Sequence, residues 1–225
     1  PTIIALVVII SIHTLHMTNF RWGIIFQDSF TLVKIGLIIF FIIFGFFVET
    51  NEQISIVPDT GDIKTILSPE FAISLIWVSY AYTGWNSSVY IAGEIEKPKV
   101  NISKSMIIAT MFVTVLYILL NYIFLYTTPV DLMIGKVEVG YIAGKQIFGH
   151  FGGKLISLGI SILLLSTVSS YIYIGPRIMH AMGEDHKVLG ILSSKNASGI
   201  PIKSFLMQLV ISIIFIFNNN FADCF

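Results

Sequence analysis

Long apolar stretches separated by short polar connections dominate this chain. Each stretch approaches the ~20 residues that a helix needs to cross a bilayer, and its apolar residues occupy every side of the helix. We place six such segments, at 2–17, 29–47, 71–91, 106–126, 155–174 and 205–217. The pattern predicts an all-α transmembrane helical bundle that forms a single domain over residues 1–225.

The segment 71–91 is interrupted by Tyr80-Ala81-Tyr82-Thr83-Gly84-Trp85-Asn86-Ser87-Ser88. Gly, Asn and consecutive Ser commit the backbone only loosely to a helix, and hydrocarbon tolerates such backbone only where it faces protein or a water-filled cavity. In many secondary transporters, broken spans expose helix ends and free carbonyls to a small charged substrate. At the start of the segment, Ser68-Pro69-Glu70 has the features of a helix N-terminus. We therefore expect a helix that begins at Ser68 and breaks beside a binding site.

Composition supports a membrane protein. Hydrophobic residues make up 55% of the chain and charged residues 12%, whereas about a quarter of the residues of a soluble domain are charged. The formal net charge is zero, and Lys and Arg form no cluster, so the expected surrounding is the lipid bilayer and no nucleic-acid partner is expected. The single cysteine, Cys224, excludes an intrachain disulfide and a Cys-based metal site.

Basic residues in the connections predict the orientation. Eight lie on one side of the predicted spans, and these are Arg21, Lys97, Lys99, Lys104, Arg177, Lys187, Lys195 and Lys203. Four lie on the other side, and these are Lys64, Lys136, Lys145 and Lys154. The positive-inside rule assigns the larger group to the cytoplasm, which places the N-terminus and the acidic connection 49–70 outside. Because the chain starts at Pro1 without an initiator Met, we interpret it as a fragment of a longer protein.

Lys34 lies near the start of the apolar segment 29–47. A charged side chain at the centre of a membrane helix costs at least ~2.5 kcal/mol, so this lysine needs partners. Its ammonium could extend to the aqueous boundary near Asp28. We favour the alternative, in which Lys34 faces the bundle interior, is held by carbonyls and hydroxyls, and substitutes for a coupling cation or titrates with a proton.

Two motifs follow one another around the interruption, Ser79-Tyr80-Ala81-Tyr82-Thr83-Gly84-Trp85-Asn86 and then Gly93-Glu94-Ile95-Glu96-Lys97-Pro98 with Asn101-Ile102-Ser103-Lys104. They resemble the sixth span and following loop of amino acid permeases in the amino acid-polyamine-organocation superfamily. Phe26-Gln27-Asp28 with Lys34 resembles the entry to the fifth span, and 175–185 resembles the end of the eighth. The resemblance implies that the six segments are spans four to nine of a twelve-span protein, whose first ten spans form a 5+5 inverted repeat with a broken helix at the substrate site.

The resemblance also implies a substrate site built from carbonyls of the interrupted segment and hydroxyls of segment 155–174. The matching residues are Tyr80, Ala81, Thr83, Trp85, Asn86, Ser166, Thr167 and Ser170. Tyr80 also matches an aromatic gate, and Lys34 matches a lysine that replaces a sodium ion in sodium-independent relatives. However, Ser166, Ser169, Ser170 and Tyr173 share one helical face, and close packing of small residues between membrane helices would explain this face equally well.

The glycine-rich first span of the family has no counterpart in this chain. We therefore expect the partners of the chain to be the missing spans of the full-length protein and a small-molecule substrate, an amino acid. The implied function is secondary active transport of amino acids across the cell membrane by alternating access, sodium-independent and either coupled to protons or working as an exchanger. The alternative is a membrane structural or partner subunit that does not transport.

Neither enzymatic activity nor a cofactor is expected. The sequence shows no nucleophile with a neighbouring base and no phosphate-binding glycine loop. His13 and His16 are three residues apart at the end of the first segment, with no carboxylate or Cys nearby. We therefore interpret them as a helix-end pair rather than as metal ligands.

Overall fold

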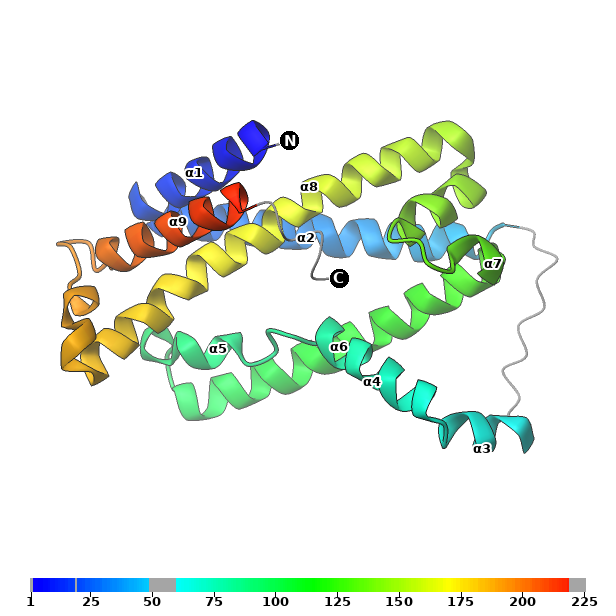
Figure 1. Ribbon diagram of the computed structural model, residues 1–225, viewed down its shortest axis with the longest axis horizontal. Helices are drawn as coiled ribbons and strands as arrows, with labels where there is room; N and C mark the ends of the chain where they lie inside the picture. Colours follow the sequence, from blue (N-terminus) through cyan, green and yellow to red (C-terminus); the bar gives the residue numbers. More distant parts are fainter. Residues whose placement is uncertain (1, 19, 49–59, 219–225) are drawn as a thin grey trace. The chain divides into compact units, whose positions relative to one another are not determined.

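A computed structural model describes residues 2–18, 20–48 and 60–218. Every element in these ranges is a helix (Figure 1), which confirms the all-α prediction. The elements are α1 (Thr2–Thr18), α2 (Phe20–Gly45), α3 (Thr60–Ile66), α4 (Pro69–Ala81), α5 (Ser87–Tyr90), η1 (Ala92–Glu94), α6 (Pro98–Thr127), α7 (Val130–Met133), α8 (Val139–Asp185), η2 (Lys187–Ser193) and α9 (Ile202–Phe217). Most of the acidic connection, 49–59, and Cys224 lie outside the described residues.

Three of these helices are long and apolar enough to cross a membrane, namely Arg21–Gly45, Pro98–Thr127 and Val139–Asp185. The helices α1 and α9 are apolar but shorter. Several helices extend beyond the apolar segments of the sequence, because a helix continues through polar residues such as Arg21 and Lys99 as long as its backbone hydrogen bonds are made.

The helix α8 contains a kink at Gly149, where the backbone has φ 73° and ψ −177°. A positive φ is readily available to glycine, whereas a side chain would make it strained. The kink separates a short first part of α8 from the long apolar part that contains the predicted segment 155–174.

The chain divides into two compact units. Unit 1 comprises Pro1–Gly36 and Ile160–Phe225. Its apolar core consists of Ile12, Ile172, Ile200 and Phe205. Within this unit α1 and α9 lie side by side (Figure 1), and the edge of the His13 ring faces the Phe205 ring with the centroids 6.4 Å apart.

Unit 2 comprises Leu37–Gly159. Its core consists of Phe41, Ile42, Leu116, Ile123, Ala143 and Ile156. Aromatic rings surround this core, since Phe41 contacts Phe124 and Phe148 at centroid distances of 5.7 and 6.2 Å. Close approach of α2 and α6 depends on Gly45, because a Cβ at this position would lie 2.3 Å from Cγ2 of Ile123.

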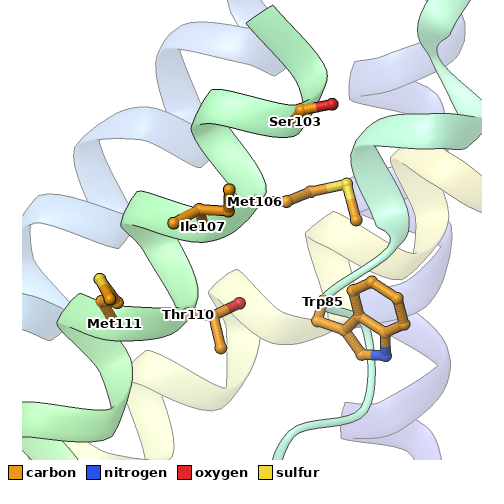
Figure 2. A pocket seen from close by; sticks show the side chains of 6 residues that line it. All are labelled: Trp85, Ser103, Met106, Ile107, Thr110 and Met111. Atoms are coloured by element: carbon orange, nitrogen blue, oxygen red, sulfur yellow. The ribbon is translucent and has the colours of Figure 1, made fainter.

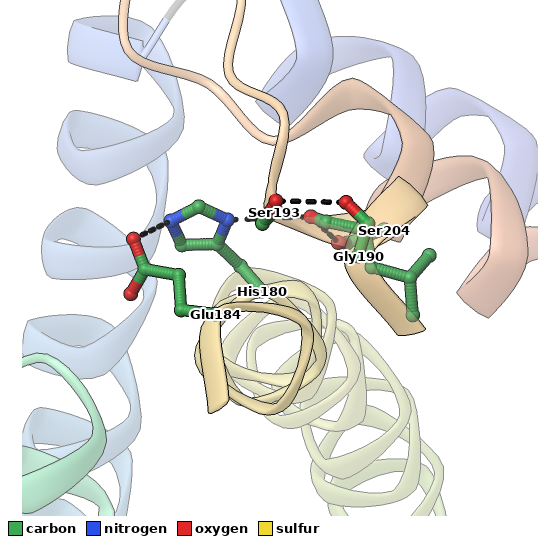
Figure 3. A network of polar contacts seen from close by, with 6 residues as sticks. His180, Glu184, Gly190, Ser193 and Ser204 are labelled. Atoms are coloured by element: carbon green, nitrogen blue, oxygen red, sulfur yellow. Dashed lines mark hydrogen bonds and ion pairs between the residues drawn. The ribbon is translucent and has the colours of Figure 1, made fainter. Parts of the chain in front are cut away.

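The connection from α8 to α9 in unit 1 is held by polar contacts (Figure 3). Two side chains meet the carbonyl of Leu192: Nδ1 of His180 lies 3.2 Å away, and Oγ of Ser204 donates to it at 3.1 Å. On its other side, Nε2 of His180 lies 3.3 Å from a carboxylate oxygen of Glu184. Gly183 lets η2 approach α8, because a Cβ there would lie 2.7 Å from the backbone nitrogen of Ser193.

Candidate functional site

The interrupted segment forms two helices with a break between them. The helix α4 begins as expected, because Ser68 is its N-cap and accepts a hydrogen bond from the backbone N–H of Phe71 at 3.2 Å. It ends at Ala81, and α5 begins at Ser87. Both the predicted start of the helix and the predicted break are therefore confirmed.

The backbone of the break is held by tight turns instead of a helical ladder. The N–H of Tyr82 bonds the carbonyl of Ser79 at 3.2 Å, and the N–H of Trp85 bonds the carbonyl of Tyr82 at 3.4 Å. Gly84 makes the change of direction possible, because its φ of 97° lies in the region that favours glycine.

A side chain of α6 satisfies a carbonyl at the end of α4. The hydroxyl of Tyr117 donates to the carbonyl of Ala81 at 2.9 Å, whereas the carbonyl of Tyr80 accepts the N–H of Thr83 at 3.0 Å. The last carbonyls of a helix have no partner inside it. Tyr117 therefore supplies from another helix a hydrogen bond that α4 cannot make for itself.

A second tyrosine ties the break to α6. The hydroxyl of Tyr82 donates to Oγ1 of Thr114 at 2.9 Å, and Thr114 in turn donates to the carbonyl of Thr110 at 2.8 Å. The rings of Tyr82 and Tyr117 pack edge to face, 5.3 Å apart between centroids and at 76°. Two hydroxyls and a ring contact thus hold the break against one face of α6.

A pocket of about 310 Å³ lies between the break and α6. We call it the break pocket, and its lining residues are Ala81, Tyr82, Thr83, Gly84, Trp85, Ala109, Thr110, Val113 and Tyr117. None of these described residues carries a formal charge. The polar groups that these residues offer are therefore backbone groups, hydroxyls and the indole N–H of Trp85.

An adjoining pocket of about 490 Å³ is mostly apolar (Figure 2). It is lined by Trp85, Ser103, Met106, Ile107, Thr110 and Met111. Figure 2 shows Trp85 on the break segment and the other side chains along α6. Trp85 and Thr110 line both pockets.

Not all the predicted residues of the interrupted segment line the break pocket. Ala81, Thr83 and Trp85 do, whereas Tyr80 and Asn86 do not. The side chain of Tyr80 is 69% exposed, and its ring lies 6.1 Å from that of Trp77. The amide of Asn86 donates to the hydroxyl of Tyr90 within the same segment, at 3.0 Å.

In unit 1, the structure brings Lys34 together with one of the predicted hydroxyls. The ammonium of Lys34 donates to Oγ1 of Thr167 at 3.0 Å. Ser170 donates to the carbonyl of Ser166 at 3.0 Å. Ser166 is fully buried, and within the described residues its own hydroxyl makes no hydrogen bond. The contact with α8 favours an interior position of Lys34 over extension to the aqueous boundary.

The serine-bearing face of α8 also packs against α1. Nε2 of His16 lies 2.9 Å from Oγ of Ser169, and its ring centroid lies 5.7 Å from that of Tyr173. The guanidinium carbon of Arg177 lies 3.7 Å from the centre of the Tyr173 ring. Packing against α1 therefore accounts for the positions of Ser169 and Tyr173 on this face.

The other histidine of α1 has a local partner, because Nδ1 of His13 lies 2.9 Å from the carbonyl oxygen of Ile9 in the same helix. The searched part of the chain contains no group of three His, Cys, Asp or Glu side chains that could hold a metal.

Sequence reasoning missed the contribution of α6. Thr110, Thr114 and Tyr117 contact the break or line its pocket. Their spacing of four and then three residues places them on one helical face. That spacing, in a segment otherwise rich in apolar residues, was the available signal.

Three long apolar helices, together with a shorter helix that breaks beside a pocket, are typical of a helical membrane protein. The model of the amino acid permease family matches residues 2–223. The chain belongs to the amino acid permease family, which confirms the resemblance stated from its motifs.

Several curated relatives share this similarity. The serine/threonine exchanger SteT of Bacillus subtilis (strain 168) is 24% identical over 190 residues, which cover 81% of this chain and 41% of the exchanger. The b(0,+)-type amino acid transporter 1 of Mus musculus is 24% identical over 220 residues, covering 95% of this chain and 44% of the transporter. The amino-acid permease RocE of Bacillus subtilis (strain 168) is 28% identical over 141 residues, covering 62% of this chain and 30% of the permease.

The chain spans less than half the length of these relatives. Their names describe an exchanger, a transporter and a permease. A transporter rather than an enzyme, the expectation from the sequence, is thus confirmed at the level of the family.

Proposed function

We propose that this chain is part of a multi-pass protein of the cell membrane that transports an amino acid by secondary active transport and alternating access. The six apolar segments would correspond to spans four to nine of a protein with a 5+5 inverted repeat. The observation that carries the proposal is the break between α4 and α5, where Ala81, the last residue of α4, lines a pocket whose lining residues carry no charge.

The chemistry of the break suits the amino group of an amino acid. The C-terminal end of a helix carries a partial negative charge, and unwound carbonyls are the groups with which broken spans bind cations. The carbonyls of Tyr80, Ala81 and Thr83 are the proposed acceptors. Trp85 and Asn86 are proposed to shape the same region, Trp85 as a wall of the break pocket.

In unit 1, Ser166, Thr167 and Ser170 are proposed substrate contacts. The buried hydroxyl of Ser166 supports this role, since a buried polar group without a protein partner is uncommon and is free to bond a ligand or an ordered water. Lys34 is the proposed coupling residue, and its bond to Thr167 links it to this group of hydroxyls. An ammonium in this position supports transport that needs no sodium and proceeds by proton coupling or by exchange.

The test is uptake of a radiolabelled amino acid mixture into proteoliposomes that contain the complete protein to which this chain belongs. Gly84→Ala forces a side chain into a positive φ at the break, so we expect uptake to fall at least about tenfold, the equivalent of ~1.4 kcal/mol. Gly36→Ala is the matched control, because a Cβ at Gly36 meets open space. If the unmodified protein takes up no amino acid, the transport proposal is wrong, and a structural or partner subunit becomes the better interpretation.

Lys34→Met tests the coupling role separately. The substitution keeps a long side chain but removes the charged hydrogen bond to Thr167, and such bonds contribute about 1.5–3 kcal/mol. We expect the rate of uptake to fall about tenfold or more and its dependence on pH to change. Lys136→Met, at an exposed position of a connection, serves as the control. Undiminished uptake by Lys34→Met would contradict the coupling role.

A further inference from the structure

The carbonyl of Ala81 needs a partner from outside its own helix. Ala81 is the last residue of α4, so the helical ladder provides no N–H for it. In a membrane, an unsatisfied carbonyl is costly because no water replaces the missing bond. The structure satisfies this carbonyl with the hydroxyl of Tyr117 at 2.9 Å.

The position of this hydroxyl is well fixed. The ring of Tyr117 packs edge to face against Tyr82, with the centroids 5.3 Å apart. Tyr82 is itself tied to Thr114 of α6 through a 2.9 Å hydrogen bond. Tyr117 and Ala81 both line the break pocket. An amino group that enters the pocket therefore meets a carbonyl that already has a donor.

An ammonium is a stronger donor than a phenol. Hydrogen bonds from charged donors are about twice as strong as those between neutral groups. We infer that, in the empty protein, the Tyr117 hydroxyl occupies the place of the substrate amino group at the Ala81 carbonyl, and that the substrate displaces it on binding. The inference rests on the proposed function, because it takes Ala81 as an acceptor for the amino group.

Displacement has a consequence that simple support of the break would not have. Each binding event must break the bond between Tyr117 and Ala81, so the hydroxyl lowers the affinity for substrate. A net contribution of ~1 kcal/mol for one hydrogen bond corresponds to about a fivefold change in affinity. If Tyr117 only supported the carbonyl, its removal would weaken binding instead.

The test is Tyr117→Phe in the complete protein, measured by uptake into proteoliposomes. The variant keeps the ring that packs on Tyr82 and removes only the donor. We expect KM to fall about fivefold while kcat does not rise, because tighter binding also slows release. The control is Tyr122→Phe, on the same helix but outside both pockets, where the ring stacks on Tyr126 at 5.8 Å. An unchanged or higher KM in Tyr117→Phe would overturn the inference.

A second measurement avoids any change of fold. 3-Fluorotyrosine is placed at position 117 of the complete protein, and its fluorine resonance is recorded with and without a transported amino acid. We expect the resonance to move on addition of substrate, and a label at Tyr122 to stay in place. A resonance at position 117 that does not respond to saturating substrate would contradict displacement. If no amino acid is taken up by the unmodified protein, the proposed function fails instead, and the two failures are thereby distinguished.

Discussion

Units 1 and 2 differ in the kinds of side chain that are buried within each of them. Among the described residues of unit 1, the buried polar and charged side chains are His13, His16, Ser166, Ser169, Arg177, His180 and Ser204. In the described part of unit 2, the buried polar residues are Thr127 and Thr128, both at the end of α6. The rest of the core of unit 2 is aliphatic and aromatic.

The contrast shows which interactions hold the helices of each unit together. In lipid, apolar side chains gain little by leaving the tails, so helix pairs depend on close packing and on hydrogen bonds between helices. Unit 1 combines a close approach of backbone at Gly183 with hydrogen bonds between buried polar side chains, such as that between His16 and Ser169. Unit 2 uses close contacts, such as Gly45 against Ile123, and gathers its polar groups at the break, beside the pocket. Three substitutions with matched controls test this difference.

The largest effect is expected at Gly183 in unit 1. A Cβ there would lie 2.7 Å from the Ser193 nitrogen and 2.9 Å from the Leu189 carbonyl oxygen, and these backbone atoms cannot move without displacing η2. Gly183→Ala should therefore lower the free energy of unfolding by about 3 kcal/mol. Gly190→Ala, in the same connection but facing open space, should change it by less than ~0.5 kcal/mol. The measurement is the midpoint of thermal unfolding in detergent. Equal midpoints for the two variants would show that the connection between α8 and α9 shifts to make room for the added methyl group.

A smaller effect is expected at Gly45 in unit 2. The methyl group of Gly45→Ala would press against Ile123, a side chain that can shift further than backbone, so we expect a loss of about 1–2 kcal/mol. Gly36→Ala on the same helix meets nothing within 4 Å and should stabilise slightly, by ~0.4–1 kcal/mol. Thermal unfolding of the two variants measures the difference. A stability loss in Gly36→Ala as large as that in Gly45→Ala would mean that close packing does not distinguish these positions.

The smallest effect is expected from the hydrogen bond between α1 and α8. Ser169→Ala leaves Nε2 of His16 without its partner, and interhelical bonds of this kind average ~0.6 kcal/mol in membrane proteins. We expect a loss of about 1 kcal/mol, because His16 is also buried. Ser170→Ala is the control for stability, since the Ser170 hydroxyl bonds a carbonyl of its own helix. Equal stability of the two variants would show that the hydrogen bond between His16 and Ser169 does not stabilise unit 1.

The sequence predicted the features that depend on local residue chemistry. The capping role of Ser68 and the break around Gly84 follow from the conformations that Ser, Pro and Gly favour. The need of Lys34 for a hydrogen-bonding partner followed from the energetic cost of its charge, and Thr167 supplies one. The resemblance to permeases, which the family match confirms, came from motifs that lie close together in the chain.

Features that depend on the rotation of a helix could not be predicted in the same way. The spacing of Thr110, Thr114 and Tyr117 places them on one face of α6, but the sequence does not show that this face meets the break rather than another helix. Tyr80 was assigned to the site from its place in a motif, which gives no information on the direction of its side chain, 69% exposed in the structure. The kink at Gly149 depends on a φ of 73°, and the identity of a glycine alone does not reveal whether its freedom is used.

Trp85 lines both pockets and can serve as an intrinsic fluorescent probe of them. Trp85 lies between the break pocket and its apolar neighbour, and the chain contains three tryptophans. With Trp22 and Trp77 replaced by Phe, the fluorescence of this chain would arise from the single indole at the break. Its emission wavelength would then follow the polarity of the space on either side, so that filling or emptying of either pocket could be observed without a label.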